Sequence, residues 1–249
     1  MSYSVKNRSF CYDSATKTFT DLGGLHIALL RGPLISTVGA INNEATPAIG
    51  LAYLAASLEK VNASVKIVDA ISLGLGRIRK LADHPGYIAE GLCFEEIADH
   101  IHPDTQALGI SIMFSGEWPI QRELISFLKD RFPQIIIVAG GEHITALPEY
   151  SLRDCPAIDY CVRGEGERTL VELLECLVAG REPSQIHGVS YIDDSGEIVA
   201  TGLLPPRIKE VDTIPWPYWP EGYLESFWSA GKSFGVQSGR DMPINVSRG

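Results

Sequence analysis

The sequence has no apolar run that approaches the roughly 18–20 residues that a membrane-spanning helix needs. Residues 1–24 are polar and lack the apolar segment of a secretion signal. The five cysteines are an odd number, which fits a reducing compartment. We therefore expect a cytoplasmic protein without a membrane span.

Motifs that would identify an activity directly are also absent. The cysteines form neither a CxxC pair nor another zinc-binding spacing, and neither GxxxxGK[ST] nor GxSxG occurs. These absences argue against a zinc site, a P-loop nucleotide hydrolase and a serine hydrolase. His100 and His102 are close in the sequence, but no cysteine or carboxylate constellation accompanies them, so no metal ligand is predicted.

Positive charge is scarce, because 21 Lys and Arg face 31 Asp and Glu, for a formal net charge of −10. This balance argues against a nucleic-acid backbone or an anionic membrane as the main partner, although a local basic pocket stays open. A hydrophobic content of 45% is ordinary for a globular protein. A chain of 249 residues can hold one large α/β domain with an appendage, or two small domains.

Strands and helices alternate from residue 25 onward. Short apolar runs bounded by turn residues predict five strands, at 25–30, 65–68, 107–113, 135–139 and 158–162. Helical spacing predicts helices at 47–61, 71–82, 94–101, 118–132, 147–152 and 169–179. Five strands joined by helices predict a doubly wound α/β fold with a parallel sheet and right-handed crossovers.

The pattern changes near residue 187. Segments 187–192 and 197–201 flank the turn residues 193–196, which predicts a hairpin at the sheet edge. Residues 205–220 are rich in proline and tryptophan and are interpreted as an extended linker over the surface. The chain is therefore divided into an N-terminal arm (1–24), an α/β domain (25–204), and a linker with the start of a further domain (205–249).

Glycine-rich turns follow four of the predicted strands, at 32–33, 115–116, 140–141 and 164–166. Ligands of such sheets bind beyond the carboxyl ends of the strands, and a residue without Cβ lets a ligand approach the backbone. The turns thus favour a ligand site, although a glycine pair can equally serve only to turn the chain. His143 is the one histidine placed to touch a ligand there, and Ser115 is placed similarly.

The turn at Gly164 is not a dinucleotide fingerprint. Its GxGxxT pattern lacks the third glycine and follows the fifth predicted strand instead of the first. Glu165 or Glu167 can favour the following helix through its dipole, or the turn can hydrogen-bond a nucleotide-like ligand. Both readings stay open on the residues alone.

Four segments together resemble the N-terminal cobalamin-binding domain of cobalamin-dependent radical S-adenosylmethionine (SAM) enzymes. They are residues 46–56 (TPAIGLAYLAA), 68–70 (VDA), 139–145 (AGGEHIT) and 163–167 (RGEGE). Each segment is weak alone, but their order and spacing are specific, and the resemblance covers residues 25–249. This group of enzymes includes methyltransferases and the anaerobic magnesium-protoporphyrin monomethyl ester cyclase.

The resemblance implies a flavodoxin-like (Rossmann-like) sheet, with the corrin ring over the strand ends and the nucleotide tail in the crevice of the sheet. The residues that it places at the cofactor are Gly32, Pro33, Ser111, Phe114, Ser115, Gly116, Gly140, Gly141, Glu142, His143, Arg163, Gly164, Glu165, Gly166 and Glu167. It assigns no catalytic residue to this chain.

Two motifs of related enzymes are missing. No D-x-H occurs, and the loop 32–44 contains no histidine, so we expect bound cobalamin to have no protein histidine as lower ligand. Residues 242–249 resemble the segment that leads into the CxxxCxxC motif of a [4Fe–4S] cluster, but those cysteines are absent. The cluster and SAM are therefore expected only in a following radical SAM domain, and this chain alone should bind cobalamin without catalysis.

The first interpretation is thus the cobalamin-binding part of a radical SAM enzyme that methylates, or cyclises through, an unactivated carbon. A stand-alone flavodoxin-like module that binds or senses cobalamin without radical chemistry is an alternative. A weaker one is the nucleotide-sugar-binding half of a transferase, since such proteins also use glycine-rich turns after strands.

Overall fold

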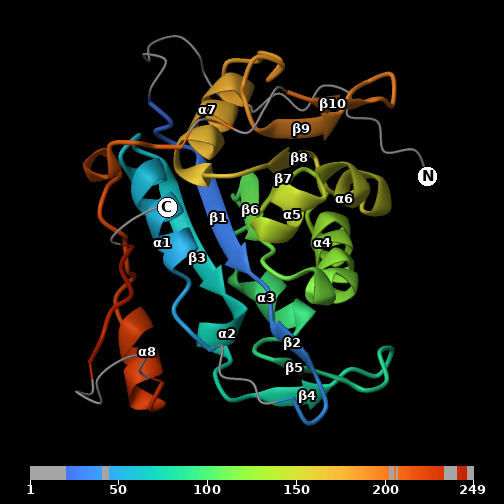
Figure 1. Ribbon diagram of the computed structural model, residues 1–249, viewed down its shortest axis with the longest axis vertical. Coiled ribbons are helices and arrows are strands. Elements are labelled where there is room, and N and C mark those ends of the chain that lie inside the picture. The colour runs from blue at the N-terminus through green and yellow to red at the C-terminus, as the bar shows by residue number, and fades with distance from the viewer. Residues whose placement is uncertain (1–20, 41–44, 202–204, 206, 233–239, 246–249) are drawn as a thin grey trace.

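The central element of the fold is a seven-stranded sheet, whose strands are labelled in Figure 1. The computed structural model describes residues 21–40, 45–201, 205, 207–232 and 240–245. Five neighbouring strands are parallel, in the order β3-β1-β6-β7-β8. They are β1 (His26–Arg31), β3 (Ser64–Asp69), β6 (Ala107–Ser111), β7 (Ile136–Gly140) and β8 (Tyr160–Val162). This confirms the predicted flavodoxin-like parallel sheet.

Both faces of the central part of the sheet are buried, because successive side chains of β1, β6 and β7 enter two different cores. On β1, Leu30 packs into one core and Leu29 into the other, and both are fully buried. One face is covered by α1 (Ile49–Glu59) and α7 (Gly166–Val178). The other is covered by α3 (Phe94–His100), α4 (Trp118–Arg131) and α6 (Pro148–Asp154) (Figure 1). The continuous apolar runs in the sequence follow from this two-sided burial.

The predicted edge hairpin is confirmed. It consists of β9 (Val189–Ile192) and β10 (Ile198–Ala200), and β9 pairs antiparallel with β8. The Asp193 carboxylate accepts hydrogen bonds from the backbone N–H groups of Ser195 and Glu197, which closes the turn.

The helix predicted over residues 71–82 is wrong. Only one helical turn forms, α2 (Ala70–Leu73), and the chain then enters β4 (Ile78–Lys80). A Cβ at Gly74 would lie 2.5 Å from the backbone carbon of Gly91, so the chain reverses where only glycine fits. With β2 (Leu34–Thr37) and β5 (Tyr87–Glu90), β4 forms a separate antiparallel sheet in the order β2-β5-β4.

The linker reaches α1 at Tyr218. The Tyr218 N–H donates to the Ala52 carbonyl over 3.0 Å, and Trp219 stacks on Tyr223. The linker then forms a helix that was not predicted, α8 (Tyr223–Ser229). Most of the proposed N-terminal arm and residues 246–249 lie outside the described residues. Within the described part of the chain, none of the helices is long and apolar enough to span a membrane.

A buried carboxylate, that of Asp69 at the end of β3, connects the sheet to α8. It accepts hydrogen bonds from Nε and Nη2 of Arg31, over 2.8 and 2.6 Å, and from the Ile71 N–H. The Tyr223 hydroxyl also donates to it, and the hydroxyl oxygen accepts the Ala48 N–H over 2.8 Å. Burial and the adjacent carboxylate raise the pKa of Tyr223, so its hydroxyl keeps the proton that it donates. The start of α1 is thereby joined to α8.

We expect Tyr223→Phe to lower the free energy of unfolding by about 1.5–3 kcal/mol, because it removes a hydrogen bond to a buried charge. Urea denaturation followed by circular dichroism measures the change. Tyr218→Phe is the matched control, since Tyr218 is partly exposed and only its backbone N–H forms a bond along the linker. Equal stability of the two variants would contradict the role given to the Tyr223 hydroxyl.

Candidate functional site

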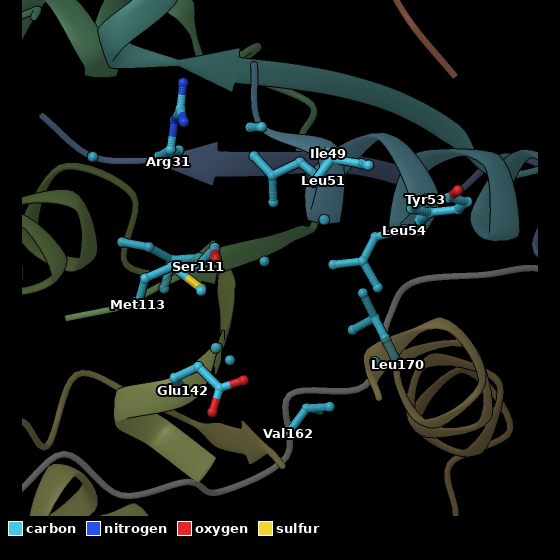
Figure 2. Close-up of a pocket in the computed structure, with 18 of the residues that line it drawn as sticks. Arg31, Ile49, Leu51, Tyr53, Leu54, Ser111, Met113, Glu142, Val162 and Leu170 are labelled. Carbon is cyan, nitrogen blue, oxygen red and sulfur yellow. The ribbon is translucent and has the colours of Figure 1, made fainter. Parts of the chain in front are cut away.

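A cavity of about 980 Å³ opens at the carboxyl ends of β1, β6 and β7. Its volume is at the upper end of the range for small-molecule sites, roughly 300–1,000 Å³. Arg31, Ser111 and Gly140, the last residues of these strands, are paired in register, so the three strand ends form one ledge. Figure 2 shows Ser111 and Met113 on one side of the cavity and Leu54 and Leu170 on the other.

The structure brings most of the predicted site residues together around this cavity. Those that line it are Gly32, Pro33, Ser111, Phe114, Gly140, Gly141, Glu142, Gly164, Glu165, Gly166 and Glu167. Four others, Ser115, Gly116, His143 and Arg163, are not part of its wall. The glycine-rich turns after separate strands thus meet in one place, as their position on a parallel sheet predicts.

Gly141 is required by the backbone itself. Its φ is +100°, and an added Cβ would lie 2.4 Å from the Ile112 carbonyl oxygen. The same carbonyl accepts the His143 N–H, and the Ile112 N–H donates to the Gly140 carbonyl, so the loops after β6 and β7 are pressed together. A bulky residue at 141 would disturb the fold as well as the cavity.

One wall of the cavity was missed from the sequence. It is formed by the approach to α1 and its first two turns, with Gly166 of α7 packed against Leu54. The residues from this segment are Thr46, Pro47, Ala48, Ile49, Gly50, Leu51, Tyr53 and Leu54. A signal was available, because residues 46–56 carry the family resemblance, but their spacing by itself predicts only a helix.

His143 lies behind the cavity in a packed cluster. It is 3% exposed, and its ring stacks on Trp118 at 4.7 Å between centroids. Nε2 is 3.3 Å from the Ser151 hydroxyl, which donates to the Leu147 carbonyl and therefore accepts from Nε2–H. Nδ1 then accepts from Ser115, over 2.9 Å. His143 thus holds the loop between β6 and α4 in place.

Arg163 also faces away from the cavity. Its backbone N–H donates to the Gly188 carbonyl, and its guanidinium donates to the Thr201 carbonyl over 3.3 Å. Arg163 therefore connects the end of β8 to the segments that flank the edge hairpin.

The linker contributes to the cavity from both of its ends. The Ile208 N–H donates to the Glu165 carboxylate over 2.7 Å, and the Asn245 N–H donates to the Tyr53 hydroxyl over 3.2 Å. Pro205, Arg207 and Asn245 line the cavity. The residues proposed to form a linker therefore complete the wall of the site.

The described residues offer no group of three or more histidine, cysteine, aspartate or glutamate side chains that could hold a metal ion. No histidine of the described chain lines the cavity. Among the described residues, the polar groups that do so are the Thr46, Tyr53 and Ser111 hydroxyls, amides and carboxylates, together with Arg31 and Arg207.

Residues 36–174 match the family described as the B12 binding domain. The chain is 33% identical over 225 residues to an uncharacterized methyltransferase of Pyrococcus horikoshii, PH0819, covering 89% of this chain and 44% of that protein. It is 28% identical to the anaerobic magnesium-protoporphyrin IX monomethyl ester cyclase of a Synechocystis strain, covering 76% of this chain and 34% of the cyclase. The chain therefore spans less than half the length of these two relatives.

A solved structure shares the fold. The cobalamin-dependent S-adenosylmethionine radical enzyme OxsB, with aqua-cobalamin and S-adenosylmethionine bound, superposes with a TM-score of 0.60 at 19% identity. The match covers 84% of this chain and 25% of the OxsB chain. At this identity the likeness shows the fold alone.

The buried His143 predicts how stability depends on pH. Burial lowers the pKa of His143 below its ordinary value near 6.5, so the unfolded chain binds this proton more readily than the folded chain. The resulting contribution of His143 to the free energy of unfolding is fully present above pH 6.5 and is lost as the pH falls below that value. We expect the melting temperature of the wild type to fall more steeply from pH 7 to pH 5 than that of His143→Phe. Parallel profiles would contradict a neutral, buried His143.

Proposed function

Because the chain belongs to the B12-binding domain family, we propose that the cavity at the ends of β1, β6 and β7 holds cobalamin. The observation that carries the proposal is the position of this cavity. The turns after three parallel strands and the start of α1 converge on a space of about 980 Å³. A volume at the upper end of the range for small-molecule pockets suits a ligand as large as a corrinoid.

The residues present suit a corrinoid. Gly140, the last residue of β7, leaves its part of the ledge without a side chain, while Leu54 and Leu170 offer an apolar wall (Figure 2). The Gln121 side-chain oxygen, which is buried without a hydrogen-bond partner, can accept from a ligand amide. These features support a ligand that combines apolar surface with many amide groups.

In the whole protein we propose that the bound cofactor serves a radical SAM enzyme. When bound, methylcobalamin supplies a methyl group. The support is that the 33%-identical relative is named a methyltransferase and that OxsB, which shares the fold, carries both cobalamin and SAM. A [4Fe–4S] cluster and SAM would be held by a further domain, and the acceptor would be an unactivated carbon of a substrate not identified by this chain.

Titration with hydroxocobalamin tests the proposal, and we expect binding at micromolar concentration or below. Gly50 lines the cavity and has no heavy atom within 4 Å of where a Cβ would be. Gly50→Trp should therefore lower the affinity at least tenfold by filling the space, with an unchanged melting temperature. Gly50→Ala is the matched control, and its affinity should stay near that of the wild type.

Two results would contradict this placement. If hydroxocobalamin does not bind at high micromolar concentration, the proposed function is wrong. If Gly50→Trp binds as tightly as Gly50→Ala, the cofactor lies elsewhere.

We further propose that the protein gives cobalt no histidine ligand, since the described cavity wall contains none. We expect the electron paramagnetic resonance spectrum of the cob(II)alamin complex to be the same for unlabelled protein and for protein with ¹⁵N-labelled histidine. A change in the nitrogen splitting between the two samples would show that a histidine coordinates cobalt.

A further inference from the structure

The charged groups around the cavity are unbalanced. Among the described residues, four carboxylates line it, those of Glu117, Glu142, Glu165 and Glu167, and the positive groups are Arg31 and Arg207. Arg31 is committed to Asp69, since Nε and Nη2 both donate to that buried carboxylate. The field inside the cavity is therefore set mainly by negative groups.

Glu142 is the carboxylate most available to a ligand. It follows Gly141 directly, is exposed, and extends into the cavity in Figure 2. Glu117 and Glu165 differ, because each accepts a backbone N–H, from Ile35 and Ile208 respectively. Within the described part of the chain, the Glu142 carboxylate takes part in neither a hydrogen bond nor an ion pair. Its acceptor capacity is left for a ligand.

Gln121 presents a second acceptor to the cavity wall. Its side-chain nitrogen donates to the Pro33 carbonyl over 3.0 Å, and the reverse orientation would place two oxygens face to face. Oε1 consequently lies beside Gly32, where a Cβ would be 2.1 Å away, and it has no donor among the described residues. Since Gln121 is only 2% exposed, leaving Oε1 unpaired is costly, and a ligand donor would remove that cost.

Amides and carboxylates meet these two acceptors very differently. A primary amide is uncharged and offers N–H donors, whereas an ionised carboxylate offers only acceptors and a negative charge. An amide can therefore donate to Glu142 or to Gln121, while a carboxylate is repelled by Glu142 and leaves Gln121 unpaired.

We propose that this cavity selects corrinoids whose ring substituents are amides and rejects the same ring bearing free carboxylates, with Glu142 as the main specificity-determining residue. The inference rests on the proposed binding of cobalamin. It adds that the site distinguishes a completed, amidated corrinoid from acid forms of the ring that have not been amidated.

The experiment compares two rings that both lack the nucleotide tail. Dicyanocobinamide carries amides, and dicyanocobyrinic acid carries free carboxylates. We expect the wild type to bind the amidated ring at least tenfold more tightly at pH 7.5, measured by isothermal titration calorimetry. Glu142→Gln should lower the ratio of the two affinities about tenfold, chiefly by raising the affinity for the carboxylated ring. Added salt should narrow the wild-type preference as well.

Glu149→Gln is the matched control, because Glu149 is an exposed carboxylate on α6 outside the cavity. It removes the same charge from the protein and should leave the preference unchanged. Gln121→Met keeps the size of the side chain and removes the acceptor, so it should weaken the amidated ring more than the carboxylated one. Melting temperatures verify that each variant is folded.

The outcomes separate this inference from the proposed function. If hydroxocobalamin binds but the wild type does not discriminate between the two rings, the selectivity is wrong and the proposed function stands. If Glu142→Gln and Glu149→Gln change the preference equally, Glu142 has no specific role. If hydroxocobalamin itself fails to bind, the proposed function is wrong and the selectivity with it.

Discussion

The buried carboxylate of Asp69 is the interaction on which the arrangement of the cavity depends. A charge that is 1% exposed is tolerated only when its oxygens are fully paired, and Asp69 receives donors from Arg31, Ile71 and Tyr223. These donors come from β1, α2 and α8, and Tyr223 passes the connection to the start of α1 through Ala48. Burial alone would lower the pKa of Arg31, but the adjacent Asp69 outweighs it, so the guanidinium stays charged.

The cavity follows from the geometry of parallel strands. Since β1, β6 and β7 are in register, they end together. The chain therefore leaves all three strands at the same end of the sheet. Glycine at 141 lets two of the exits cross at contact distance. The space between these exits and α1 is the cavity.

The sequence was most informative where structure is local. Five apolar runs predicted five parallel strands, because burial on both faces leaves a continuous signal. The sheet of β2, β4 and β5 escaped prediction, since its short strands are partly exposed and β2 pairs with β5 far along the chain. Position 143 shows a finer limit: Glu142 and His143 both follow Gly141, but a helical step of about 100° turns one to the cavity and the other to the core.

The bond between Tyr223 and Ala48 has a consequence for how the molecule opens and closes locally. Ala48 lies in the cavity wall, while Tyr223 belongs to α8, which packs beside α2 on the outer side of the sheet. Local opening of α8 must therefore break the hydrogen bond of the Ala48 N–H in the cavity wall. A ligand that immobilises this wall slows such opening, so amide hydrogen exchange in α8 reports on occupation of a cavity that α8 itself does not line.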